Sequence, residues 1–498
     1  MPETTADRGH LFVLHGLIEN FDYDAVIVPT DHRFDVTSHW PASVTGDLDH
    51  ARPATWPTPF ARSRGGEAVW FVSVADEQPL TDDDLIGRVR DILSEIAASE
   101  FPQVEGRELR RVALPVVGIG AGGLGERRGA ILGALLDALH AAATDLSLDI
   151  LLVTPDSAVF SAAQHARRAL LDGGTAQWEL DADELAEAQR LGALAAEGHL
   201  ALFLGAGVSI AAGLPSWSQL LTQLSAEVGE LPADFNDLGS LDQAQFLAAS
   251  IGAERLNDAV SDIVGRRRKV ALAHALLAGL GCRETVTTNY DDLYEIAVEA
   301  TRRPRPTILP WQVVDERRPW LLKLHGDIER STSIVLTRRD FVLFDAKSRP
   351  AGSLLQALLL TKHVLIVGAS LADDNVIRLA MEVDEYLQQS DARAEQGTFI
   401  DVSGVEARKQ LWTRQFSWFV CDGATRSERV RRMEVFLDAV AAFAASDAPW
   451  LLDERFEGLL GEADQVVVEQ ARRLAAATDA SSGLVAPLRR ALRGLGAD

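Results

Sequence analysis

The chain has 498 residues, a formal net charge of −25, 47% hydrophobic residues and two cysteines. This length exceeds one ordinary hydrophobic core and predicts two or three domains, and the composition is globular rather than disordered. The acidic balance argues against a protein that coats nucleic acid, so no direct nucleic-acid partner is expected. Cys282 and Cys421 lie far apart in the sequence and exclude a disulfide framework and a four-cysteine zinc site.

No segment predicts export or a membrane span. Met1–His10 is polar and lacks the basic-then-apolar order of a secretory signal. The most apolar long window that we identify, Leu354–Leu371, is interrupted by Lys362 and His363. We therefore expect a soluble, cytoplasmic protein with no membrane partner.

The first part of the chain, residues 1–175, is predicted to be an α/β domain. Its helices are expected at Thr81–Ala98 and Arg127–Ala143, where apolar residues recur at helical spacing. Four short runs rich in Val and Ile are predicted as strands: Ala25–Val28, Ala68–Val74, Val112–Val117 and Asp149–Thr154. Strands that alternate with helices predict a largely parallel sheet.

Residues 176–445 are predicted to form a second α/β domain, and residues 446–498 a helical C-terminal tail with an amphipathic helix pair. The strand candidates of the second domain are His199–Leu204, Glu284–Thr287, Trp320–Leu324, Ser333–Leu336, Val364–Val367 and Thr398–Val402. Helical stretches separate them, so another parallel sheet is expected.

A glycine-rich turn follows the first of these strands. Gly205-Ala-Gly-Val-Ser209 comes directly after Leu200–Leu204, and a helix is predicted from Trp217. A strand, a glycine turn and a helix allow backbone N–H groups to approach a pyrophosphate, because no Cβ blocks the way. The spacing is not the full G-x-G-x-x-G fingerprint, and a tight turn without a ligand is an equal alternative.

Three further polar or glycine-containing segments follow predicted strands: Thr287–Asp291, Lys323–Asp327 and Gly368–Leu371. The first alone is equally explained as a turn before a helix, and His325 in the second alone as a structural histidine. However, the carboxyl ends of parallel strands meet at one edge of a sheet, where α/β proteins bind ligands. The four segments are therefore expected to converge on one crevice.

In this order, GAGVS…GLPSW, TTNYD, KLHGD and VGASL resemble the motifs of the sirtuin family, and most of all those of the bacterial SIR2-like proteins of antiphage defence. The resemblance covers about residues 190–445. It implies a SIR2-type, Rossmann-like parallel sheet that binds NAD. It also implies cofactor-binding roles for Gly205, Ala206, Gly207, Ser209, Gly368 and Ser370, and catalytic roles for Asn289, Asp291 and His325.

Two departures from the family pattern narrow the predicted activity. Deacylating sirtuins hold zinc with four cysteines, which this chain does not have, so no zinc is expected. Ser216-Trp217-Ser218 replaces the family's Asp-Phe-Arg, so that arginine has no counterpart here. Deacylation thereby loses support, and an NAD hydrolase of antiphage defence is the leading hypothesis. A non-catalytic NAD or ADP-ribose sensor and an ADP-ribosyltransferase are the alternatives.

The predicted chemistry follows from the leaving group. Nicotinamide departs from NAD as a neutral molecule without a general acid, so the enzyme must stabilise an oxocarbenium-like ribose and deliver water. Asn289 suits the positioning of the water or the ribose, and Asp291 suits contact with the carboxamide. His325 suits acceptance of a proton, because histidine ordinarily titrates near neutral pH.

The N-terminal domain resembles a macro domain, a fold that binds ADP-ribose. Gly16–Val28 is similar to the opening strand of that family, and Pro115–Leu124 to its glycine-rich phosphate loop. The resemblance implies a ligand loop made of Asp31, Gly118, Gly120, Gly122 and Gly123. A nucleotide-derived or phage-derived activator is the expected partner there. A scaffold that has lost its ligand is an equal alternative, because fold does not fix function. A homo-oligomer is also expected.

Overall fold

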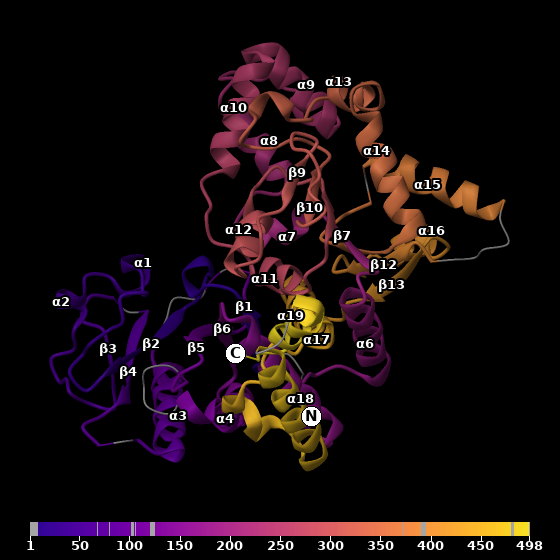
Figure 1. Cartoon of the computed structure of the whole chain (residues 1–498). Coiled ribbons are helices and arrows are strands. Elements are labelled where there is room, and N and C mark those ends of the chain that lie inside the picture. Colours follow the sequence, from indigo (N-terminus) through magenta and orange to yellow (C-terminus); the bar gives the residue numbers. More distant parts are fainter. Residues whose placement is uncertain are drawn as a thin grey trace. The chain divides into compact units, whose positions relative to one another are not determined.

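The computed structural model describes residues 8–66, 68–78, 80–100, 104, 106–119, 125–371, 373–389, 395–479 and 483–497. The chain divides into two compact units, one formed by residues 1–196 and 434–498 and the other by residues 197–433 (Figure 1). These limits differ from the predicted boundaries at 175/176 and 445/446. One reason is that Gly192, in the helix that precedes residue 197, packs directly against Phe443.

The first unit contains a six-stranded sheet in the order β1-β6-β5-β2-β4-β3. All its pairs are parallel except β3 with β4. The strands are β1 (Leu11–His15), β2 (Ala25–Asp31), β3 (Phe60–Arg62), β4 (Val69–Ala75), β5 (Arg110–Pro115) and β6 (Leu148–Thr154). The predicted α/β class with a largely parallel sheet is confirmed, but β1 and β3 were not predicted.

The helices of the first unit come from both ends of the chain. They are α1 (Ala42–Thr45), α2 (Leu48–Ala51), α3 (Asp82–Ala98), α4 (Arg128–Leu146), α5 (Ser157–Asp172), α6 (Ala182–Ala196), most of α17 (Arg426–Ala444), α18 (Glu462–Asp479) and α19 (Ala486–Gly494). Trp450 and Phe456 belong to the same hydrophobic core as Leu132 and Leu139 of α4. The C-terminal segment is therefore part of this unit's core, and its α18–α19 pair agrees with the predicted helix pair.

One helical stretch of the described residues, Gly125–Leu146, is long and apolar enough to cross a membrane. The window predicted as most apolar, Leu354–Leu371, is thus not the one that meets this test. Half of the apolar 18-residue window within this stretch is buried, and Ile131, Leu132 and Leu136 lie in the core of the first unit. The core helix of a globular protein can have the same composition as a membrane-spanning helix, so this stretch is weak evidence for a membrane span.

The second unit contains a seven-stranded, fully parallel sheet in the order β13-β12-β11-β7-β8-β10-β9. Its strands are β7 (Leu200–Leu204), β8 (Glu284–Thr287), β9 (Thr307–Leu309), β10 (Trp320–Lys323), β11 (His363–Val367), β12 (Gly397–Asp401) and β13 (Phe416–Val420). Strands β7 and β11 are nearly continuous apolar runs, as expected for central strands with helices on both faces.

The helices of the second unit connect these strands. They are α7 (Ala206–Ile210), α8 (Trp217–Ser225), α9 (Ser240–Ile251), α10 (Ala253–Val264), α11 (Leu272–Gly279), α12 (Leu293–Ala300), α13 (Arg338–Val342), α14 (Phe344–Thr361), α15 (Asp374–Gln388) and α16 (Glu406–Trp412), followed by the start of α17. Ser216 and Gln219 form a capping box that begins α8.

The predicted strand Ser333–Leu336 is wrong. A short 3₁₀ helix ends at Ser333, and the backbone N–H of Val335 donates to the carbonyl oxygen of His325 at 2.8 Å instead of joining the sheet. Ile334 and Leu336 are buried on either side of Val335, which produces the alternating pattern that resembles a strand. Strands β9 and β13 were not predicted.

Candidate active site

A cavity of about 740 Å³ opens at the carboxyl ends of β7, β8, β10, β11 and β12, within the second unit. Every residue predicted for the SIR2-like site lines it: Gly205, Ala206, Gly207, Ser209, Asn289, Asp291, His325, Gly368 and Ser370. The predicted convergence of four segments on one crevice is confirmed. The roles of the individual residues remain proposals.

The two glycine turns of the cavity pack against each other. Gly207 N–H donates to the carbonyl oxygen of Gly368 at 2.8 Å, and Gly205 N–H donates to that of Val367 at 2.9 Å. A Cβ on Gly205 would lie 2.5 Å from the backbone of Ala369, and one on Gly207 would lie 2.7 Å from Gly368 O. Within the protein, therefore, these glycines are required by the close approach of two backbone turns.

Asn289 follows β8 and is 9% exposed. Its amide Nδ2 donates to the carbonyl oxygen of Gly205 and to Ser209 Oγ, both at 3.1 Å. These bonds fix the amide's orientation, and Oδ1 is then buried without a hydrogen-bond partner in the protein. Asn289 lines the cavity, and an acceptor without a protein partner at such a residue is a candidate contact for a ligand hydroxyl or amide group.

Ser209 connects Asn289 to a buried polar network. Its hydroxyl donates to Asp291 Oδ2 at 2.9 Å and accepts from Asn289 and from His274 Nε2, which lies 3.3 Å away. The His274 Nδ1 accepts from Ala271 N–H, and burial lowers the pKa of His274 to about 4, so the ring is neutral. One donated and two accepted bonds use the full capacity of a hydroxyl. Ser209 therefore supports Asn289 rather than offering a free group to phosphate.

Asp291 is buried at the start of α12 and both its oxygens are engaged. Oδ2 accepts from Ser209, and Oδ1 accepts from Leu293 N–H at 3.1 Å. Each carboxylate oxygen can accept a second bond. Contact with a carboxamide therefore remains compatible with this geometry, although the predicted role is not tested by it.

His325 pairs with an acid that the sequence did not single out as a site residue. His325 Nε2 lies 2.8 Å from Asp373 Oδ2, and the two side chains are 7% and 19% exposed. The ring also packs edge-on against Phe341. Burial would raise the pKa of Asp373, but His325 and the backbone N–H groups of Asn375 and Val376 hold it below its usual value. The acid is thus ionised and favours a proton on Nε2.

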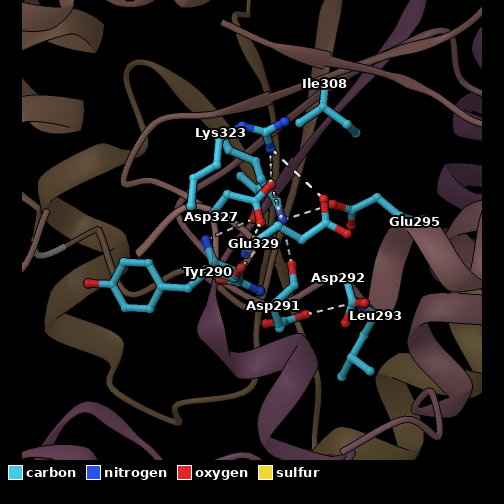
Figure 2. A network of polar contacts seen from close by, with 12 residues as sticks. Tyr290, Asp291, Asp292, Leu293, Glu295, Ile308, Lys323, Asp327 and Glu329 are labelled. Carbon is cyan, nitrogen blue, oxygen red and sulfur yellow. Dashed lines mark hydrogen bonds and ion pairs between the residues drawn. The ribbon is translucent and has the colours of Figure 1, made fainter. Parts of the chain in front are cut away.

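Lys323 does not line the cavity but is fully buried, and it binds the backbone of Tyr290 and Asp291, the two residues that follow Asn289 (Figure 2). Its Nζ donates to the carbonyl oxygens of Asp291 at 2.8 Å and Tyr290 at 3.3 Å. It also lies 2.8 Å from Glu295 Oε1 and 3.4 Å from Asp327 Oδ2. Burial alone would lower the pKa of Lys323, but the two carboxylates raise it overall, so the ammonium stays charged.

Sequence reasoning missed Asp373, Lys323 and His274 as parts of the site. Lys323 begins the predicted segment Lys323–Asp327, and Asp373 lies two residues after the predicted segment Gly368–Leu371. The available signal was therefore their place after strands β10 and β11. His274 lies within the very apolar helix α11 and carries no local signal. Only its contact with Ser209, 65 residues away, shows its role.

The predicted N-terminal ligand loop is only partly described. Gly118 follows β5 with φ +84°, a conformation that favours glycine. Gly120, Gly122 and Gly123 lie outside the described residues. Asp31 closes a turn in which its Oδ1 accepts from the N–H groups of Arg33 and Asp35, both at 2.8 Å. This arrangement explains Asp31 as a turn residue and does not test its binding role.

The two cysteines are both buried and unbridged. In the part of the chain that the structure describes, no three His, Cys, Asp or Glu side chains are grouped as metal ligands would be. Of the acids that line the cavity, Asp373 pairs with His325. Asp291 accepts from Ser209 and Leu293 N–H, and Asp401 accepts from Ser403 N–H and Trp418 Nε1.

Residues 283–415 match the family of SIR2-like domains. The matched range includes Asn289, Asp291, His325 and Gly368, whereas the Gly205–Ser209 turn lies outside it. The resemblance to SIR2-like proteins is thereby confirmed. The macro-like character of the N-terminal unit remains a prediction.

Several curated proteins are similar to this chain over part of its length. The chain is 28% identical over 251 residues to "NAD(+) hydrolase ThsA" of Bacillus cereus, covering 50% of each protein. It is 32% identical over 201 residues to the protein of that name from Enterococcus faecium, covering 39% of this chain and 42% of the relative. "Defense-associated sirtuin 2" of Bacillus subtilis is 23% identical over 186 residues, or 36% of this chain and 18% of its own length. The chain thus spans about half the length, or less, of the curated relatives it matches.

Proposed function

We propose that the second unit binds NAD and hydrolyses it to nicotinamide and ADP-ribose. The observation that carries the proposal is the buried, unpartnered Oδ1 of Asn289, a residue that lines the same cavity as His325. The cavity's volume, about 740 Å³, lies in the range of sites that enclose a cofactor-sized molecule. The names of the relatives support the same substrate.

The proposed reaction breaks the bond between C1′ of the ribose and the nicotinamide nitrogen. The bonding electron pair leaves with nicotinamide, which becomes neutral, and the ribose carbon becomes oxocarbenium-like. A water oxygen then bonds to C1′ and loses one proton. Asn289 Oδ1 orients the ribose or the water, and the carboxylate of Asp291 accepts a hydrogen bond from the carboxamide of the nicotinamide.

His325 is the proposed proton acceptor. With a proton on Nε2 facing Asp373, the other ring nitrogen carries the lone pair that takes up the proton from water or a ribose hydroxyl. Asp373 touches the histidine and acts through it, so it is a positioning residue. His274, Ser209 and Lys323 hold the loop of Asn289 and Asp291 in place.

The wider biological role is part of the same proposal. A defence-associated relative and the named hydrolases favour an NAD-depleting effector in bacterial antiphage defence. Unregulated loss of NAD would kill the host cell, so we propose a gate. In this proposal the protein is a cytoplasmic homo-oligomer, and the gate opens when a nucleotide-derived or phage-derived activator binds the N-terminal unit.

The test is nicotinamide release by the purified full-length protein, with His325→Ala and Asn289→Ala as variants. We expect release by the wild type and a loss of about 100-fold or more in each variant. Labelled acceptor protein in the same assay detects an ADP-ribosyltransferase. NAD binding without release, with or without lysate from phage-infected cells as activator, would leave the sensor alternative. Unchanged release in both variants would overturn the site.

A further inference from the structure

The cations of the cavity are gathered at one end. Among the described residues that line it, the Arg and Lys side chains are Arg408, Arg426 and Arg429, and no lysine is present. They come from α16 and the first turn of α17, the helices that follow β12 and β13. Asn289 and His325 follow β8 and β10 on the other side of the sheet's glycine turns.

Arg429 is held rigidly by backbone. Its Nε donates to the carbonyl oxygen of Val402 at 3.0 Å and its Nη1 to that of Gly423 at 2.9 Å. A Cβ on Gly404, where φ is +69°, would lie 3.3 Å from the guanidinium carbon. The chain therefore approaches this guanidinium closely on one side, and carbonyl contacts leave its positive charge unneutralised.

None of the ion pairs found among the described residues joins these three arginines to a carboxylate. The nearest acid in the sequence that also lines the cavity, Asp401, is engaged elsewhere. Its Oδ1 accepts from Ser403 N–H at 2.7 Å and its Oδ2 from Trp418 Nε1 at 3.1 Å. In a chain of net charge −25, three unneutralised guanidinium groups at one end of a cavity are available to an anion.

We propose that Arg408, Arg426 and Arg429 form a subsite for the phosphate groups of the dinucleotide, and so orient the substrate along the strand ends. This inference rests on the proposed function of the same cavity. Ser216-Trp217-Ser218 supplies no cation after the glycine turn, and Ser209 has no free hydrogen-bonding capacity, so the diphosphate needs charge from elsewhere.

The span of the cavity agrees with this orientation. From β10 through β8, β7 and β11 to β12 there are four steps between neighbouring strands, or about 19 Å. A dinucleotide with its nicotinamide at Asn289 and His325 would place its diphosphate and adenosine toward β12. The arginines then face either the diphosphate or a 2′-phosphate on the adenosine ribose, and the two sources predict different specificities.

The test measures binding rather than cleavage, with ADP-ribose and ADP-ribose 2′-phosphate as probes and the full-length protein in a calorimeter. The variants are the double substitution Arg408→Gln/Arg426→Gln and, separately, Arg429→Gln. The control is Arg414→Gln, because Arg414 is an exposed arginine of the same unit that does not line the cavity. Arg408 and Arg426 are half-buried and exposed, so their replacement leaves the fold intact.

We expect the double variant to bind about tenfold more weakly or worse, and the control to bind as the wild type does. An equal loss for both probes assigns the arginines to the diphosphate, and a loss confined to the second probe assigns them to the 2′-phosphate. Wild-type affinity for both probes in all variants, or no binding by the wild type, overturns the subsite. Arginine-dependent binding without nicotinamide release would overturn the proposed hydrolase alone.

Discussion

Asp373 Oδ2 lies 2.8 Å from His325 Nε2, and the same carboxylate caps helix α15 through the N–H groups of Asn375 and Val376. One side chain thus fixes both the histidine and the helix that begins beside it. Leu371, two residues earlier, has φ +47°, a backbone conformation that is uncommon for a residue with a side chain. Such conformations are often found at functional sites.

Asp373→Asn separates these two functions. Asparagine caps a helix about as well as aspartate, so the melting temperature should change little. The charge facing His325 is lost, and we expect nicotinamide release to fall about 10- to 100-fold with a changed pH–rate profile. Glu385→Gln, an exposed acid later on α15, is the matched control. A wild-type rate and profile for Asp373→Asn would remove the acid from the mechanism.

Lys323→Met should lower the free energy of unfolding of the second unit. The change leaves Glu295 and Asp327 buried without their cation, and removes the donor to the Tyr290 and Asp291 carbonyl groups. Breaking a buried pair in this way costs about 3–5 kcal/mol, measured by urea unfolding.

Two further variants separate charge from packing in this cluster. Adding Glu295→Gln to Lys323→Met should restore part of the stability, because one uncompensated charge is removed. Lys347→Met removes an exposed lysine 3.9 Å from Asp340 and should cost less than about 1 kcal/mol. Equal losses in Lys323→Met and Lys347→Met would contradict the view that the Lys323 cluster supports the site.

His274 predicts a pH dependence of stability. Burial lowers its pKa to about 4 from 6.5, so the unfolded chain takes up a proton at a higher pH than the folded chain. The contribution of this group to the free energy of unfolding is therefore fully present above about pH 6.5 and is lost as the pH falls toward 4. The expected loss from pH 7 to pH 5 is about 2 kcal/mol.

Comparison with a variant isolates the contribution of His274. His274→Gln should reduce the fall in unfolding free energy between pH 7 and pH 5 by that amount. His199→Gln, which replaces an exposed histidine of the same unit, should leave the fall unchanged. If the His274 variant keeps the wild-type pH slope, the ring is not buried in its neutral form.

In the first unit, Asp438 organises a buried polar cluster. Its Oδ2 accepts from Arg167 Nη2 at 2.6 Å, Trp178 Nε1 at 2.8 Å and His10 Nε2 at 2.9 Å. Burial opposes ionisation, but Arg167 and His10 hold the pKa of Asp438 well below its usual range. The stability that it contributes is thus present at neutral pH and lost as the pH falls below about 4.

Asp438→Ala should destabilise the first unit by about 3–5 kcal/mol at neutral pH, because Arg167 is left buried with its charge uncompensated. The measurement is thermal or urea unfolding followed by tryptophan fluorescence. Asp145→Ala, an exposed acid of the same unit, should lie within about 0.5 kcal/mol of the wild type. A loss no larger than that of Asp145→Ala would contradict the cluster's structural role.

Most of the sheet architecture was predictable because a buried parallel strand appears in the sequence as a short run of apolar residues. The four motifs were predictable for a related reason, since each directly follows such a run at one edge of the sheet. Strand β9 has three residues and β13 contains Trp418 and Ser417 on partly exposed positions, so neither produces a clear run. The strand prediction for Ser333–Leu336 was wrong because buried and partly exposed residues alternate there although the segment pairs with no strand.

The support of the site was harder to predict because it depends on long-range contacts. The pairing of Asp373 with His325 joins segments about 50 residues apart, and that of Ser209 with Asp291 joins segments 82 residues apart. Neither spacing leaves a periodic trace in the sequence. The same holds for the arginines, which come from two helices and gather only when β12 and β13 are in place.

The discontinuous first unit has a practical meaning for dissecting this protein. A fragment that stops at residue 196 would lose Asp438, Trp450 and Phe456, and with them the counterion of Arg167 and part of the hydrophobic core. A chain in which a flexible linker joins residue 196 to residue 434 would keep all three. Ligand screens on the N-terminal unit should therefore use the spliced chain. If a simple truncation bound no ligand, its incomplete hydrophobic core would explain the result, and the result would not show that the predicted loop lacks binding activity.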